Sequence, residues 1–156
     1  MRLIKRDNET VVFHLGRREK GLLVQLLQLY PQVPSNHPRA CKSGKIKPST
    51  EQLLKEALNE HRTEQKKQIS GLLNDASRWT EHHQGWHLRL NSAEVEWLLQ
   101  ILNDIRVGSW VQLGAPEESI EVIDEKNAPH LWAMEIAGSF EMALLHTLEA
   151  PPQPPK

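Results

Sequence analysis

The spacing of the apolar residues constrains this chain more than any other feature of its sequence. In two long segments, apolar side chains recur every three or four positions, which is the period of an α-helix. The first segment follows Asn91 or Ser92, either of which can cap a helix, and it contains Val95, Leu98, Leu99, Leu102 and Ile105. The second segment opens near Asn127 and contains Leu131, Trp132, Ile136, Phe140, Leu144 and Leu148. The pattern predicts a mainly helical protein, in which we expect Gly138 to permit close contact between helices.

Two further helices are predicted in the first half of the chain. A leucine-rich helix is expected over residues 17–30, and Pro31 ends it because proline disfavours helical geometry in the residue before it. Another helix is expected over residues 50–80, with Ser49 able to cap it. Ten successive polar residues, 59–68, interrupt the apolar stripe of that helix. The helix therefore either crosses solvent in this region or breaks into two.

The remaining ordered segments alternate between apolar and polar residues, which is the pattern of a β-strand. Residues 3–4 and 10–15 form a hairpin around the turn residues 7–8, and residues 86–90 supply a third strand. These elements predict an α+β fold that is mainly α. We expect a bundle of four to five helices with a small amino-terminal β-hairpin, extended to three strands if residues 86–90 join it.

The length and composition of the chain fit one soluble domain. We expect residues 1–150 to form it and the proline-rich residues 151–156 to be a disordered tail. No apolar run is long enough to cross a bilayer, and residues 1–6 lack the apolar centre of a signal peptide. The single cysteine, Cys41, excludes an internal disulfide. These features predict a cytoplasmic protein with no membrane partner.

Charge is distributed unevenly along the chain. Residues 1–70 hold 14 Lys and Arg against 7 Asp and Glu, whereas residues 71–156 hold 5 against 13. The basic half is compatible with binding to nucleic acid. The simpler interpretation, which we favour, is that basic and acidic elements face each other in the fold or in a dimer.

The most irregular stretch, residues 31–49, contains no acidic residue and four prolines. A loop of this length is usually functional or mobile. Its basic residues form a candidate contact for an anion or a partner: Arg39, Lys42, Lys45 and Lys47. The segment around Lys45 does not fit a phosphate-binding loop, because two of the four required positions fail. We interpret Cys41, four residues after His37, as an incidental thiol.

Histidines at 82, 83 and 87 are the nearest approach to a metal-binding pattern. No cysteine cluster accompanies them, so we interpret them as polar residues of a connection and expect no metal or other cofactor. The chain also has no nucleophile elbow, because Gly138-Ser139 lies inside a predicted helix. We assign no catalytic residue.

Two other residue sets invite interpretation. Trp97, Trp110 and Trp132 lie among leucines at helical spacing and are expected in the core, whereas Trp79 and Trp86 flank a polar connection and are the better surface candidates. Trp79 is also the last residue of the apolar stripe predicted for helix 50–80. A polar set interrupts the apolar helix that begins near residue 92, and it consists of Asn103, Asp104 and Arg106. Buried polar groups must be paired, so we favour a structural hydrogen-bond network over a catalytic site.

The segment Leu102-Asn103-Asp104-Ile105-Arg106, followed by Leu113-Gly114, resembles the central motif of a family of small uncharacterised bacterial proteins. That family is catalogued as a domain of unknown function, number 2017 in that series. The segment at residues 88–94 and the Trp-bearing final helix around Trp132 fit the same pattern, so the resemblance covers most of residues 1–149. It implies a bacterial protein and brings no established activity. The family's genes often neighbour the Clp protease adaptor, which implies a link to proteolysis.

Three function classes follow from the sequence. We favour a non-catalytic interaction or regulatory protein that contacts a protein partner, or itself, through helix 50–80 and the basic loop. One alternative is a small enzyme whose site gathers Asn103, Asp104, Arg106 and a histidine. Another is a nucleic-acid-binding regulator that uses the basic amino-terminal half, although the chain has neither a recognisable reading motif nor a basic pI.

Overall fold

A four-stranded antiparallel sheet and four helices make up the described part of this computed structural model, which covers residues 1–7, 9–33, 48–117, 120 and 122–149. The strands are β1 (Arg2–Arg6), β2 (Thr10–Gly16), β3 (Trp79–His82) and β4 (Gly85–Asn91). The helices are α1 (Arg17–Gln28), α2 (Pro48–Asn74), α3 (Ser92–Gln112) and α4 (Ala128–Glu149). The predicted fold class, α+β and mainly α with an amino-terminal hairpin, is confirmed.

The sheet has the strand order β1-β2-β4-β3, so two local hairpins meet where β2 pairs with β4. Alternation along β2 follows the prediction: Val11, Phe13 and Leu15 are buried, and the residues between them are not. Leu90 and Leu88 lie opposite Val11 and Phe13 on β4 and are fully buried too. One face of the sheet therefore forms the floor of the hydrophobic core.

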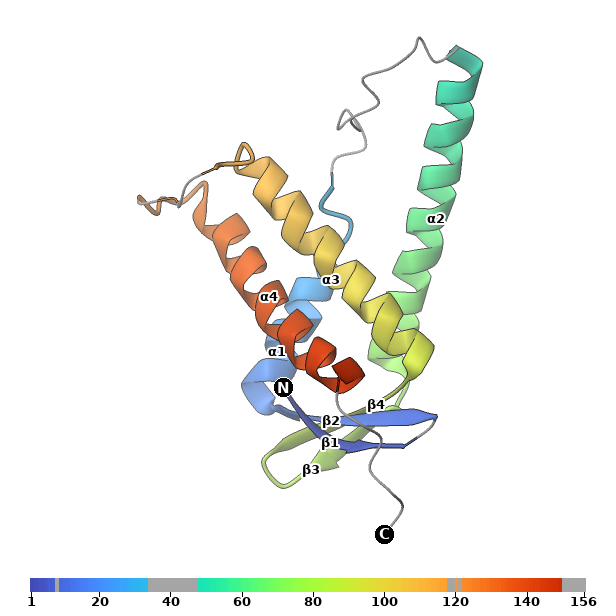
Figure 1. Ribbon diagram of the computed structural model, residues 1–156, viewed down its shortest axis with the longest axis vertical. Helices are drawn as coiled ribbons and strands as arrows, with labels where there is room; N and C mark the ends of the chain where they lie inside the picture. The colour runs from blue at the N-terminus through green and yellow to red at the C-terminus, as the bar shows by residue number, and fades with distance from the viewer. Residues whose placement is uncertain (8, 34–47, 118–119, 121, 150–156) are drawn as a thin grey trace.

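The helices cover that face only, and the opposite face of the sheet is left open (Figure 1). α3 and α4 lie side by side and run in opposite directions, and they make the largest helix–helix contact. α3 begins where predicted. Asn91 Oδ1 accepts a hydrogen bond from the Glu94 amide at 2.8 Å, and Glu94 Oε2 accepts one from the Asn91 amide at 2.8 Å. This reciprocal cap fixes the angle at which α3 leaves β4.

α2 runs without a break through the ten polar residues 59–68, so the helix crosses solvent there rather than breaking into two. It ends at Asn74 rather than near residue 80, so Trp79 belongs to β3 instead of the helix. The reason is a turn: Asp75 Oδ1 accepts hydrogen bonds from the Ser77 amide at 2.9 Å and the Ser77 hydroxyl at 2.6 Å. The sheet consequently has a fourth strand, β3, whose first two residues were expected at the end of the helix.

Close helix packing falls at a different glycine from the one expected. A Cβ atom added to Gly138 would meet no atom within 4 Å, so that residue permits no close contact. A Cβ added to Gly108 would lie 2.3 Å from the carbonyl carbon of Gln32 and 2.4 Å from the amide nitrogen of Val33. α3 therefore packs directly on the backbone of the segment that follows α1.

Candidate functional site

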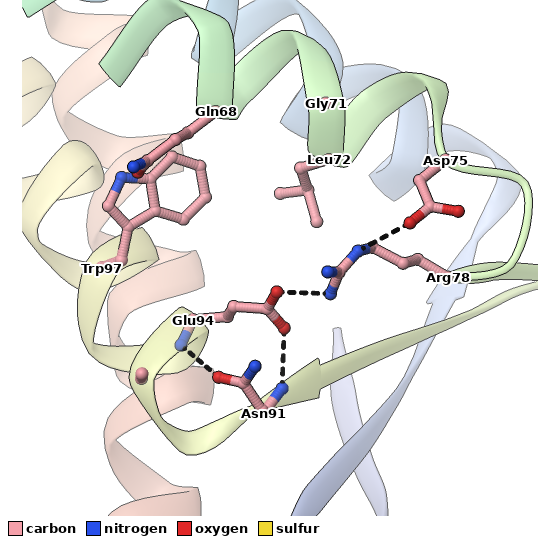
Figure 2. A pocket seen from close by; sticks show the side chains of 9 residues that line it. Gln68, Gly71, Leu72, Asp75, Arg78, Asn91, Glu94 and Trp97 are labelled. Atoms are coloured by element: carbon pink, nitrogen blue, oxygen red, sulfur yellow. Dashed lines mark hydrogen bonds and ion pairs between the residues drawn. The ribbon is translucent and has the colours of Figure 1, made fainter. Parts of the chain in front are cut away.

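A hollow of about 530 Å³ lies where the end of α2 meets the start of α3 (Figure 2). The α2 side is formed by Gln68, Gly71, Leu72 and Asp75, and the remaining wall by Arg78, Asn91, Ala93, Glu94 and Trp97. The floor is apolar where Leu72 enters the core, and the rim is polar. The hollow is therefore shaped like a shallow binding site at the base of a helix.

Charges on the rim of the hollow are paired with one another. Arg78 donates through Nε to Asp75 Oδ2 at 3.0 Å and through Nη1 to Glu94 Oε1 at 2.6 Å (Figure 2). The bond to Glu94, followed by the bond to Asp75, raises the pKa of Arg78. Both carboxylates also cap turns, so this cluster fixes β3 against α2 and α3 rather than offering a free acid or base.

The amino-terminal part of α2 projects away from the sheet and from the other helices, which we call the body (Figure 1). We call residues 49–68 of α2 the arm. Its side chains are exposed apart from Leu58, Arg62 and Gln65, which are half-buried. Arg62 Nη2 donates to the Val33 carbonyl at 2.7 Å, and Gln65 Oε1 accepts a hydrogen bond from the Trp97 indole. The apolar contacts that hold α2 come later in the helix, at Ile69 and Leu72.

The arm carries two large apolar side chains that the fold does not cover. Leu53 is 66% exposed and Leu54 is 56% exposed. Steps of three or four residues place Leu53, Ala57, Glu60 and Glu64 in one line that continues to Gln68 and Gly71 at the hollow. We call these six residues the docking line.

The polar set on α3 lies away from the hollow and is engaged in packing contacts. Asp104 Oδ1 accepts a hydrogen bond from the Gln32 amide at 2.9 Å, which ties α3 to the segment after α1. Arg106 donates through Nε to Glu141 Oε2 on α4 at 3.0 Å and through Nη2 to Asn103 Oδ1 at 3.4 Å. Asp104 and Arg106 thus bind different neighbours.

Glu141 is a carboxylate buried between α3 and α4. Within the described part of the chain, its Oε1 atom has no hydrogen-bond partner, and neither has the hydroxyl of Ser109, which is fully buried. Burial raises the pKa of Glu141, and the charge of Arg106 opposes this only in part. Folding therefore disfavours the charged form of this side chain.

Replacing Glu141 with glutamine tests this description. Glu141→Gln keeps the acceptor for Arg106 and removes the buried charge, so we expect the variant to be more stable than the wild type at neutral pH. Below the ordinary glutamate pKa of 4.5, the wild-type carboxyl is protonated in both the folded and the unfolded state. The difference in the free energy of unfolding between the variant and the wild type should therefore shrink as the pH falls through the raised pKa of the folded state towards 4.5. Urea unfolding at several pH values measures the difference, and a difference that grows towards low pH would contradict this account.

Histidines gather on the open face of the sheet in a different combination from the one considered in the sequence. The ring centroids of His82 and His87 are 4.6 Å apart and the rings are stacked, while His14 lies 5.5 Å from His87 and 6.4 Å from His82. His83 lies in the exposed turn between β3 and β4. Burial, with the neighbouring His82 and His14, lowers the pKa of His87. Across the described residues, no three His, Cys, Asp or Glu side chains are placed to hold a metal ion.

The tryptophans differ from the prediction at two positions. Trp79 is buried rather than exposed, and its indole nitrogen donates to the Leu72 carbonyl at 2.9 Å. Trp110, expected in the core, is 39% exposed and donates to the Pro116 carbonyl at 3.2 Å. Trp86 is half-buried beneath the ammonium group of Lys20, which lies 3.2 Å from its ring centroid. In both exceptions the indole N–H group donates to a backbone carbonyl, which the spacing of apolar residues in the sequence does not show.

Residues 34–47 of the basic loop lie outside the described residues, and so do the four cations assigned to the loop: Arg39, Lys42, Lys45 and Lys47. His37, Cys41 and the proline-rich tail at 151–156 lie outside them as well. The predictions made for these positions stay predictions.

Comparison of the chain with protein-family models, with curated proteins and with solved structures found no match. Among the described helices, none combines the length and the apolar character needed to cross a membrane.

Proposed function

We propose that this protein is a non-catalytic interaction protein that binds an amphipathic helix of another protein along the docking line of α2. The observation that carries the proposal is the exposure of Leu53 and Leu54 on a helix that the body holds at one end. A helix that projects into water without tertiary contacts is only marginally stable. A partner that covers these leucines and fills the hollow beside Trp97 would supply the missing contacts.

The charge of the docking line favours a basic partner. The arm as a whole is balanced, with four glutamates against three lysines and one arginine, but the docking line carries Glu60 and Glu64 and no lysine or arginine. The contact of Lys67 with Glu64, at 3.8 Å, is exposed and therefore weak. A second copy of the chain would bring Glu60 and Glu64 against the same two glutamates, so a basic helix from a different protein is the better complement.

The contacts of the polar set on α3 support a non-catalytic assignment. Asp104 is bound to the Gln32 amide and Arg106 to Glu141, and neither lines the hollow. The enzyme alternative needs these groups to converge with a histidine in a concave site. The described histidines that cluster do so on the other side of the sheet.

Two double variants of the arm test the proposal. Leu53→Ser with Leu54→Ser removes apolar area, and Glu60→Lys with Glu64→Lys reverses the charge; each should weaken partner binding at least about tenfold. The matched control is Glu117→Lys with Glu125→Lys, which makes the same charge change at exposed sites elsewhere. Since the family resemblance links the chain to Clp-type proteolysis, the Clp adaptor of the same organism is the first purified probe. Quantitative capture from lysate is the second.

A protein retained by the wild type and the control, but lost from both arm variants, supports the proposal. Circular dichroism shows whether each variant keeps its fold. Retention of the same proteins in the same amounts by all four chains overturns it. A concentration-dependent dimer in light scattering that disappears in the leucine variant would instead assign the surface to a second copy.

A further inference from the structure

Basic side chains gather on the open face of the sheet, and the pairing of the strands shows which of them are neighbours. Antiparallel pairing places Arg2 beside His14, His14 beside His87 and His87 beside Thr80, so these four side chains form a row across all four strands. A second row consists of Lys5, Val12 and Arg89. His82 pairs with Gly85 at the end of the face. We call Arg2, Lys5, His14, His82, His87 and Arg89 the basic face.

No acidic side chain belongs to this surface in the described residues. Every outward position of the four strands, as far as the structure describes them, is basic, hydroxylic, amide, apolar or glycine. Glu81 pairs with Trp86, which places it on the side of the sheet that the helices cover. Two acids lie close to this face: Asp7 in the β1–β2 turn, whose Oδ2 atom is 3.5 Å from Lys5 Nζ, and Glu19 in α1, which interacts with His14. The exposed pair of Asp7 with Lys5 is weak and screened by salt, and Glu19 is paired with the amino terminus of Met1.

The face is exposed as well as basic. Arg2, Lys5, His82 and Arg89 are exposed, while His14 and His87 are half-buried by their neighbours. Figure 1 shows all four helices on the opposite side of the sheet. In the described residues no carboxylate pairs with Arg2 or Arg89. The cations of this face lie on β1 and β4, with histidines on β2, β3 and β4 beside them. Cations that are spread along a sheet, rather than converging in a pocket, suit an extended anion.

We infer that the basic face binds single-stranded nucleic acid, a function separate from the docking line. Arg2, Lys5 and Arg89 neutralise phosphates along the strand, and the stacked rings of His82 and His87 offer an aromatic surface for unpaired bases. A duplex is a poorer fit, because its bases are read by a helix or ribbon that enters a groove, and this face is flat. Half of the basic face comes from β3 and β4, which belong to the acidic half of the sequence.

Fluorescence anisotropy with a labelled oligouridylate of about 12 nucleotides tests this inference. Three phosphate contacts predict that the logarithm of the binding constant falls with the logarithm of salt concentration with a slope of about −2. Arg2→Glu with Arg89→Glu should weaken binding more than about tenfold at about 0.1 M salt and make the slope shallower by about 1.4. The matched control, Lys66→Glu with Lys67→Glu on α2, changes the net charge equally and should leave binding unchanged.

A second variant separates base stacking from charge. His82→Ala, measured near pH 8 where imidazole is largely neutral, should weaken binding about fivefold and leave the salt slope unchanged. Absence of binding at about 50 mM salt overturns the inference, and so does an equal loss in the arginine variant and its lysine control. Competition by polyglutamate as effective as that by unlabelled oligonucleotide would assign the face to an acidic protein. None of these outcomes depends on Leu53 or Leu54, so the two proposals fail separately.

Discussion

Gly108→Ala should lower the free energy of unfolding by about 3 kcal/mol or more, the upper range for an overpacked site. The new Cβ atom would lie 2.3 Å from the carbonyl carbon of Gln32 and 2.4 Å from the amide nitrogen of Val33. Neither atom can rotate away, since both belong to the backbone. Relief requires the segment after α1 to move, which breaks the hydrogen bond from the Gln32 amide to Asp104.

Gly138→Ala is the matched control and should have the opposite sign. It makes the same chemical change inside a helix, at a site with no heavy atom within 4 Å of the new Cβ. Alanine is favoured over glycine there by about 0.5–1 kcal/mol. Urea unfolding followed by circular dichroism measures both variants. Equal stability of Gly108→Ala and the wild type would show that α3 does not pack on residues 32–33.

Trp79→Ala should cost about 3–5 kcal/mol, the usual loss for truncating a buried aromatic residue. Trp79 is 7% exposed, and its indole nitrogen donates to the Leu72 carbonyl, so this side chain connects β3 to the last turns of α2. Its removal opens a cavity beneath the hollow and leaves the Leu72 carbonyl without that donor. The end of α2 should therefore loosen more than the sheet does.

Trp79→Phe separates the two contributions of the indole. Phenylalanine keeps most of the apolar area and lacks the N–H group, so we expect a loss of about 1 kcal/mol. Amide hydrogen exchange gives the location: protection at residues 69–74 should fall in the alanine variant before protection in β2 does. Similar losses in both variants, or uniform loss of protection, would contradict the role of Trp79 as the anchor of α2.

The sequence was informative wherever the structure is local. The alternation of Val11, Phe13 and Leu15 identified the buried face of β2, and the capping residues Asn91 and Ser92 marked the start of α3. Both signals depend on neighbours within a few residues, which the sequence displays directly. For the polar stretch 59–68, the sequence left open whether the helix crosses solvent or breaks into two, and the structure shows the first.

Prediction failed at Trp79 because this residue continues the helical spacing of α2, and the local turn at Asp75 that ends the helix was overlooked. The other failures lie where contacts join distant segments. His14 was not considered with His82 and His87, because the pairing of β2 with β4 that brings them together cannot be read from either strand alone. The basic face has the same origin. Gly108 was overlooked for the same reason, since nothing near it in sequence shows that a backbone crosses it.

The strand order also has a kinetic consequence. Each hairpin forms between neighbours in sequence, whereas the central pairing of Gly16 with Gly85 joins residues about 70 positions apart, with α1 and α2 between them. Closing so long a loop costs entropy before any contact repays it, so the two halves of the sheet should dock after the hairpins and the α3–α4 pair have formed. The assembled sheet is then the last part of the molecule to arise, and His14 joins His82 and His87 of the β3–β4 hairpin only at that step.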